Sequence, residues 1–132
     1  MTTINVNTRS VNRLVGFAFG AVYLLVGLVG FAITSGVGFA HTHGKDLIIF
    51  ELNPLHNIVH VAIGLLVGLA AYRGVATAAA ANTLVGGVYL AVGVVGLFLT
   101  DSAANILAVN HPDNALHLAT ALVLLGAGLT RK

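Results

Sequence analysis

The sequence predicts an all-α fold, a transmembrane four-helix bundle built from two tandem helical hairpins. Three observations predict it: an apolar composition, four apolar stretches of membrane-spanning length, and a repeat that relates the two halves of the chain. Of the 132 residues, 58% are hydrophobic and only 8% are charged, and the mean hydropathy is +0.97. So few charged side chains cannot cover a water-facing surface, which excludes a soluble globular domain.

Composition also excludes several kinds of chemistry and partner. The chain has no cysteine, which excludes disulfides, thiolate nucleophiles and cysteine-ligated zinc or iron–sulfur sites. Its net charge is only +2 and its basic residues do not cluster, so we expect no nucleic acid partner. The sequence has no serine elbow, no phosphate-binding loop and no pair of membrane-embedded acids. We therefore expect no catalytic residues and no enzymatic activity.

Four apolar stretches have the roughly 20 residues that a helix needs to cross the hydrocarbon core of a bilayer. They are 12–34, 54–72, 79–100 and 112–130. We expect a single integral membrane domain over 1–132, with a first hairpin over 12–72 and a second over 79–130. Pro54 and Pro112 suit the first position of a helix, and Asn53 suits an N-cap position. The long loop between the first two spans carries an apolar run, 47–50, which we expect at the membrane interface.

Basic residues predict the orientation in the membrane. Five of them adjoin one side of the four spans: Arg9, Arg13, Arg73, Arg131 and Lys132. Only Lys45 adjoins the other side. Because lysine and arginine favour the cytoplasmic side, we expect a multi-pass protein with both termini in the cytoplasm. All six histidines and all four acidic residues then fall on the outer side, where we expect any chemistry to lie.

The first and third spans look like copies of one another. Matching residues recur at a constant offset: Gly20 and Gly86, Tyr23 and Tyr89, Gly27 and Gly93, Gly30 and Gly96, Thr34 and Thr100. This match, and a length beyond that of a typical signal peptide, predict that the first span is retained. The second and fourth spans share an Asn-x-x-His pattern. Hairpins that enter the membrane in the same direction are parallel repeats, related by an axis along the membrane normal.

Glycines recur at helical spacing in the spans, where small residues let helices approach closely in lipid. We expect them to form helix-packing seams: Gly20, Gly27, Gly30, Gly64, Gly68, Gly86, Gly93 and Gly96. The alternative is a contact face for a second copy of the chain or for a larger membrane complex. Tyr23 and Tyr89 lie near the middle of their spans. We expect their buried hydroxyls to bond a neighbouring carbonyl, with a proton relay as the alternative.

Paired polar residues in the second and fourth spans are the strongest functional candidates. They occupy equivalent positions in the two halves: His56 and Asp113, Asn57 and Asn114, His60 and His117. Each asparagine precedes its histidine by three residues, on the same helix face. Ionisable side chains at this depth are costly and usually face the bundle interior. We therefore expect His60 and His117 to face each other near the repeat axis.

Several uses compete for this polar cluster. The sequence favours a structural clasp without a cofactor, in which asparagine and histidine side chains bond across helices. The second use is a metal site, in which two neutral imidazoles joined by His56 or Asp113 suit zinc, copper or iron. The third is a b-type haem with His60 and His117 as axial ligands, although close glycine packing argues against the width that haem needs. Proton or ion passage and a lipid-processing pocket beside His56 are further alternatives. The outer-loop pair His41 and His43 can also bind copper or zinc, but short polar loops often contain histidine by chance.

The stretch 53–64, Asn-Pro-Leu-His-Asn-Ile-Val-His-Val-Ala-Ile-Gly, resembles a family of small bacterial membrane proteins, the domain-of-unknown-function family numbered 4383. The segment 113–117 is similar to that family's second motif, and 89–96 is similar to its third helix. The resemblance covers nearly the whole chain from Arg13 onward. It implies a four-span protein of the bacterial plasma (inner) membrane, and it implies no known activity, substrate or cofactor. The departures are in the outer loop, at His41, His43 and Lys45, which counts against metal binding by that loop.

Two functional hypotheses follow. The leading one is a non-enzymatic structural or accessory protein of the lipid bilayer, as a homo-oligomer or in a larger complex, with the polar cluster as a packing clasp. The alternative is a metal- or haem-binding membrane protein with a redox or transport role, in which His60 and His117 are ligands.

Overall fold

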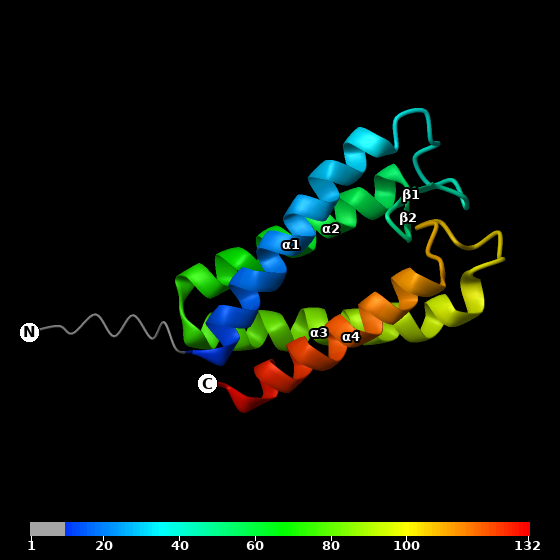
Figure 1. Cartoon of the computed structure of the whole chain (residues 1–132). Coiled ribbons are helices and arrows are strands. Elements are labelled where there is room, and N and C mark those ends of the chain that lie inside the picture. The colour runs from blue at the N-terminus through cyan, green and yellow to red at the C-terminus, as the bar shows by residue number, and fades with distance from the viewer. Residues whose placement is uncertain (1–9) are drawn as a thin grey trace, which may run out of the picture.

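The computed structural model describes residues 10–132, and four long helices make up most of it. They are α1 (Val11–Ile33), α2 (Pro54–Arg73), α3 (Val75–Leu99) and α4 (His111–Thr130). A small antiparallel pair of strands, β1 (Lys45–Leu47) and β2 (Phe50–Leu52), lies in the connection between α1 and α2. Figure 1 shows two antiparallel helix pairs. We call the end with the connections 34–53 and 100–110 the loop end, and the opposite end the terminal end.

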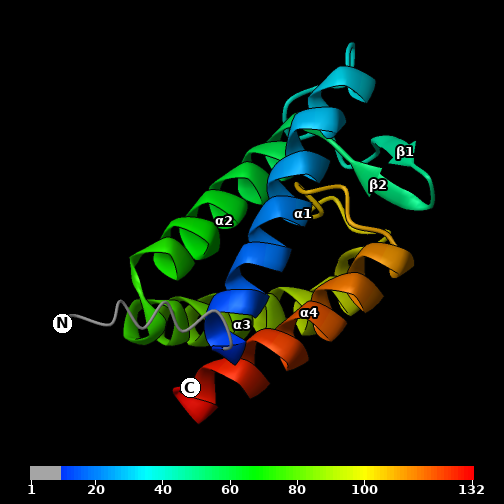
Figure 2. The same cartoon turned by 60° about the vertical axis from the view of Figure 1, so that its left-hand side comes forward.

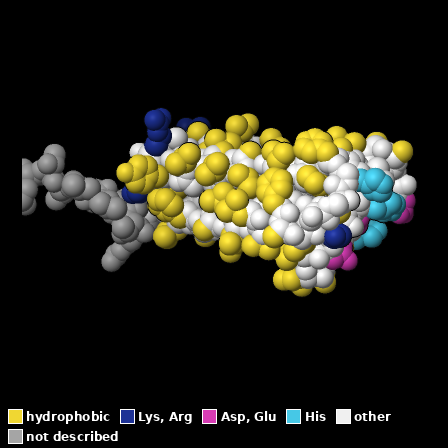
Figure 3. Space-filling view, turned by 90° about the horizontal axis from the view of Figure 1, so that it is seen from above, with side chains coloured by type: hydrophobic (Ala, Val, Ile, Leu, Met, Phe, Trp, Pro, Cys, Tyr) yellow, Lys and Arg dark blue, Asp and Glu magenta, His cyan; other side chains and the backbone are white. Residues whose placement is uncertain are grey.

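All four helices are long and apolar enough to cross a membrane, so the chain is a multi-pass protein of the lipid bilayer. This confirms the predicted all-α, four-helix fold. The surface of the bundle is largely hydrophobic along its length (Figure 3). Lysine and arginine lie mainly at the terminal end, and histidine and acidic side chains lie at the loop end (Figure 3).

The observed helices differ from the predicted spans mainly at the start of α3, which begins at Val75 rather than at residue 79. The reason is Gly74, which ends α2 and begins α3 with a φ of 150°. A residue with a Cβ rarely adopts this conformation, so glycine lets the chain reverse within one residue. Apolarity alone, on which the prediction rested, does not reveal such a tight connection.

The two strands were not predicted. They pair Lys45 with Leu52, Asp46 with Glu51 and Leu47 with Phe50. The apolar run 47–50, whose expected place at the membrane interface stays a prediction, forms the end of this hairpin, with Ile48 and Ile49 at its turn. Ile48 at the turn has a φ of 62° and is 86% exposed. Its β-branched side chain disfavours that conformation, so turn rules based on glycine or asparagine miss it.

The helices pack mainly within hairpins, α1 on α2 and α3 on α4, and the two hairpins touch each other less. The hairpins are inclined to one another, as Figures 1 and 2 show from two directions. Glycine lets the helices approach within each hairpin. A Cβ added to Gly20 would come within 2.9 Å of the Gly64 carbonyl oxygen, and one added to Gly86 within 2.8 Å of the Leu125 backbone nitrogen. Close packing by small residues is the usual basis of helix association in lipid.

The two hairpins repeat the same contacts at the loop end. Gly30 of α1 lies against the side chain of Asn57 on α2, and a Cβ at this glycine would overlap the amide oxygen. Gly96 of α3 lies against Asn114 of α4 in the same way. The two tandem hairpins therefore place their asparagines by one shared device.

Candidate functional site

Three histidines from the two hairpins meet inside the bundle, near its loop end. His56 and His60 lie one turn apart on α2, and His117 lies on α4. Each of them is only 1% exposed. The ring centroids lie 4.3 Å apart for His56–His60, 5.5 Å for His56–His117 and 5.9 Å for His60–His117. We call these three residues the histidine cluster.

The start of each helix fixes where these rings point. In α2, the Asn53 side chain accepts a 2.8 Å hydrogen bond from the backbone N–H of His56, and Pro54 opens the helix. This confirms the predicted N-cap. In α4, Asn110 and Asp113 form a capping box, each side chain accepting from the other residue's backbone N–H at 3.0 Å. With both starts fixed, the inward faces of α2 and α4 carry the histidine cluster.

The ring nitrogens of the cluster lack hydrogen bonds. Neither Nδ1 nor Nε2 of His56, His60 or His117 has a hydrogen-bond partner among residues 10–132. One candidate ligand nitrogen of each ring lies within 4.8 Å of those of the other two. A buried polar group without a partner costs about 1–3 kcal/mol, and a neutral imidazole presents one donor and one acceptor. Burying three such rings together costs free energy at one place in the bundle. A metal ion that accepts one lone pair from each ring would offset part of this cost.

A small cavity of about 30 Å³ adjoins the cluster. Besides the three histidines, it is lined by one phenol and by aliphatic side chains: Tyr89, Val59, Ile63, Val88, Val92 and Leu107. A space of this size corresponds to about one water molecule or one ion. The cavity is therefore large enough for an ion and too small for an organic cofactor.

Two tyrosine rings pack against the histidine cluster. Tyr89 stacks on His117 with ring centroids 4.9 Å apart, and Tyr23 lies edge-on to His60 at 5.1 Å. The Tyr23 hydroxyl forms a 2.6 Å hydrogen bond with the Thr120 hydroxyl. The Tyr89 hydroxyl has no partner in the described part of the chain. Neither phenol bonds the neighbouring carbonyl that the sequence predicted, so that expectation is wrong within residues 10–132.

The structure brings together only part of the predicted polar cluster. His60 and His117 face each other as expected, and His56 joins them. Asp113 accepts the Asn110 backbone N–H in the capping box at the start of α4. The converging ligand group described in residues 10–132 includes no carboxylate. Asn57 donates a 2.9 Å hydrogen bond to the Thr34 hydroxyl, within its own hairpin. The Asn114 side chain has no partner among the described residues.

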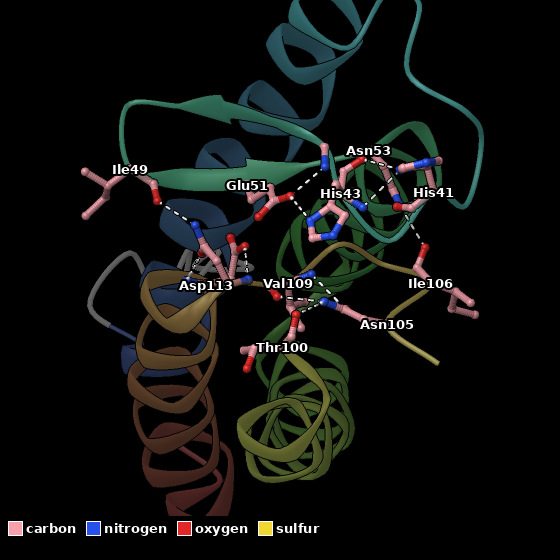
Figure 4. Close-up of polar contacts among 12 residues, drawn as sticks. His41, His43, Ile49, Glu51, Asn53, Thr100, Asn105, Ile106, Val109 and Asp113 are labelled. Carbon is pink, nitrogen blue, oxygen red and sulfur yellow. Dashed lines mark hydrogen bonds and ion pairs between the residues drawn. The ribbon is translucent and has the colours of Figure 1, made fainter. Parts of the chain in front are cut away.

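The connections at the loop end cover the histidine cluster, and the two cap asparagines join them. The amide of Asn53 donates to the carbonyl oxygens of His41 and Ile106, at 2.9 and 2.7 Å. The amide of Asn110 donates to the Ile49 carbonyl oxygen at 2.9 Å. Each asparagine thus caps one hairpin and bonds the loop of the other, as Figure 4 shows around Asn53 and Ile49. Sequence reasoning missed these cross-links, although Asn53 and Asn110 occupy equivalent places in the repeat.

The outer-loop histidines lie apart from the cluster. His41 and His43 are exposed, and the His41 Nδ1 accepts a 3.1 Å hydrogen bond from the His43 backbone N–H. The His43 Nδ1 lies 4.0 Å from a carboxylate oxygen of Glu51 (Figure 4). In the part of the chain that the structure describes, they form no group of three converging ligands.

A second buried polar group lies at the terminal end, and the sequence analysis did not single it out. The Asn82 amide of α3 donates to the backbone and side-chain oxygens of Asn12 in α1, both at 3.0 Å. The Asn12 amide donates to the carbonyl oxygens of Ala127 and Lys132, at 2.8 and 2.9 Å. We call Asn12 and Asn82 the terminal clasp. An asparagine inside an apolar span was the signal that could have revealed it.

A family model described as a domain of unknown function matches residues 13–130, which include the whole histidine cluster. No curated protein and no solved structure matches the chain.

Proposed function

The chain belongs to the family described as domain of unknown function DUF4383, and we propose that it is a membrane protein that binds one metal ion through the histidine cluster. One observation carries the proposal. Six ring nitrogens of three buried histidines have no hydrogen-bond partner within residues 10–132, and one nitrogen of each ring converges with the others. Imidazole is a good ligand for zinc, copper, iron and nickel. An ion bonded to one nitrogen of each ring would satisfy three of these six atoms and offset part of the cost of burying them.

The structural clasp, which the sequence favoured, has weaker support. A clasp stabilises a bundle through hydrogen bonds between helices. Among the described residues, none of the three rings makes such a bond, and Asn57 bonds within its own hairpin. A structural or accessory role, and assembly into an oligomer or a larger complex, stay predictions that the metal proposal does not require.

Haem fits this site poorly. The ring centroids of His60 and His117 are 5.9 Å apart, and His56 and Tyr89 fill the space beside them. The adjoining cavity of about 30 Å³ is far smaller than a porphyrin. A haem would have to separate the two hairpins, so a small ion is the ligand that the geometry favours.

The membrane topology is also part of the proposal. Basic residues at the terminal end support a cytoplasmic location for both chain ends, in the plasma membrane of a bacterium. The histidine cluster then lies in the outer half of the bilayer, beneath loops that face the outside. We propose a role in holding or moving the ion, with no catalytic residue.

The test is metal retention by the purified protein. The chain is loaded in detergent with zinc, copper or nickel, freed of excess ion, and examined by elemental analysis. We expect one ion per chain, and loss of that ion when His60→Gln and His117→Gln are combined. Glutamine preserves polarity and approximate size while weakening ligation. The matched control is His41→Gln combined with His43→Gln, which leaves the cluster intact and should retain the ion. A wild-type protein without stoichiometric metal, or a cluster variant that keeps it, would contradict the proposal.

A further inference from the structure

We infer that the ion is copper(I), held in three-coordinate geometry by the histidine cluster. This inference rests on the proposed metal site and specifies the ion that the site selects. Three features of the cluster carry it: the charge of its ligands, their number, and the nature of the surrounding wall.

The ligands are electrically neutral. All three are imidazoles, the chain has no cysteine, and the converging group in residues 10–132 includes no carboxylate. The three ligands therefore leave the charge of a bound ion uncompensated, and the buried carboxylate of Asp113 lies outside the converging group. The cost of burying an ion in a medium of low dielectric constant rises with the square of its charge, so a divalent ion costs about four times as much as a monovalent one. Neutral ligands in a buried site thus favour an ion of charge +1.

The number of ligands agrees with this. Zinc is almost always four-coordinate in proteins, with a water completing the set where only three protein ligands are present. Such a water requires at least two polar partners of its own. Among the described residues, the cavity lining beyond the histidines has one polar side chain, Tyr89, beside Val59, Ile63, Val88, Val92 and Leu107. The site is therefore better suited to an ion that is satisfied by three ligands.

Among monovalent ions, the type of ligand atom decides which ion the site binds. Sodium and potassium are hard ions that prefer oxygen ligands, whereas copper(I) binds nitrogen and sulfur ligands. Copper(I) also has a filled d shell and readily accepts three nitrogen ligands in a plane. The aliphatic wall and the closed loop end would limit the access of water and oxidants to the bound ion. Charge, coordination number and donor type thus agree on one ion.

The experiment compares ions on the intact protein in detergent. Under anaerobic conditions the chain is titrated with copper(I) against a copper(I) chelator, and in parallel with zinc(II) against a zinc indicator. Silver(I), which does not change oxidation state, serves as a second monovalent probe. We expect one copper(I) or one silver(I) per chain, with weaker zinc binding. His60→Gln should weaken copper(I) binding more than about 100-fold, beyond the effect of outer-shell changes. His41→Gln is the matched control and should leave the affinity unchanged.

X-ray absorption at the copper edge tests the inference on the wild-type protein alone, so its result does not depend on whether a variant folds. We expect a three-coordinate copper(I) spectrum with imidazole scattering. A preference for zinc, or a four-coordinate copper site, would overturn the copper(I) inference and leave the proposed metal site standing. Failure to retain any of these ions would overturn both.

Discussion

The two ends of the bundle satisfy their buried polar groups in different ways. At the terminal end, the Asn82 amide N–H groups bond Asn12 and the Asn12 amide N–H groups bond backbone carbonyls, at 2.8 to 3.0 Å, and the Asn82 Oδ1 alone has no partner in residues 10–132. At the loop end, the three rings of the histidine cluster make no hydrogen bond within residues 10–132. Both groups are almost completely buried. The chain therefore joins its helices by amide hydrogen bonds at one end and gathers unpartnered imidazoles, which we propose as metal ligands, at the other.

The chemistry of the side chains explains this difference. An asparagine carries a donor and an acceptor on one amide, so Asn12 and Asn82 can bond each other and the nearby helix end. Each neutral imidazole also carries one N–H donor and one lone pair, but among residues 10–132 no ring of the histidine cluster bonds another. A cation that accepts one lone pair from each ring would stabilise this arrangement.

The largest effect should come from the ion itself. At a free-ion concentration of 1,000 times the Kd, binding to the folded state alone stabilises it by about 4 kcal/mol. We expect silver(I) or copper(I) to raise the free energy of unfolding of the wild type by this amount and that of His60→Gln by at most about 1.4 kcal/mol, as a 100-fold weaker affinity implies. Denaturation in mixed micelles, with and without the ion, measures both. An equal response of the two proteins would place the ion elsewhere.

Loss of the terminal clasp should weaken the protein whether or not an ion is present. Asn82→Ala removes two hydrogen bonds to Asn12 and leaves buried oxygens without a partner. We expect a loss of about 1–3 kcal/mol in the free energy of unfolding, equal with and without metal. Thr77→Ala, an exposed change on the same helix, is the control. A loss that disappears on adding metal would contradict the separation of the two ends.

When no metal is present, an apolar replacement should change the free energy of unfolding in opposite directions at the two ends of the bundle. His60→Leu removes a buried polar group that has no partner in the described residues, and replaces it with a side chain of similar size. We expect the metal-free protein to be unchanged or more stable by up to about 1 kcal/mol. Asn82→Leu should instead be destabilising. Thermal unfolding after chelator treatment checks the signs, and a marked loss of stability in metal-free His60→Leu would support the clasp interpretation.

A small effect should also come from the asparagines that join the loops. Asn110→Ala removes a helix cap and the hydrogen bond to the Ile49 carbonyl oxygen. We expect a loss of about 1 kcal/mol, together with faster ion uptake because the cover over the cluster is weaker. Stopped-flow measurement of silver(I) uptake tests this, with the exposed loop change Asp101→Asn as control. Uptake no faster than in the control would show that the loops do not limit access.

The fold was largely predictable from the sequence, because spans and repeats are properties of pattern. The repeat placed His60 and His117 opposite each other, and Asn53 and Pro54 marked the start of α2. The difference between the two halves of the polar cluster was harder to predict from the sequence. His56 and Asp113 occupy equivalent positions, yet His56 joins the rings while Asp113 closes a capping box with Asn110. That choice depends on where α4 begins, and the prediction started this helix at Pro112.

Apart from the approach of His60 and His117, contacts between the hairpins could not be predicted, because they depend on how two rigid units are inclined. The bond between Asn12 and Asn82 joins residues far apart in sequence, and the repeat does not relate them. The cross-links from Asn53 to Ile106 and from Asn110 to Ile49 likewise require the final positions of the loops. The local signals were the polar residues themselves, and their partners came from tertiary packing.

Nitrogen-15 NMR of histidine-labelled protein, titrated with silver(I) or zinc(II), tests the central claim most directly. Both ions are diamagnetic, so the ring nitrogens of every histidine can be followed separately. We predict that one equivalent of ion shifts ring nitrogens of His56, His60 and His117 together and leaves those of His41, His43 and His111 in place. Shifts confined to the exposed histidines, or no shift at one equivalent, would contradict the assignment of the buried cluster as the ligand set.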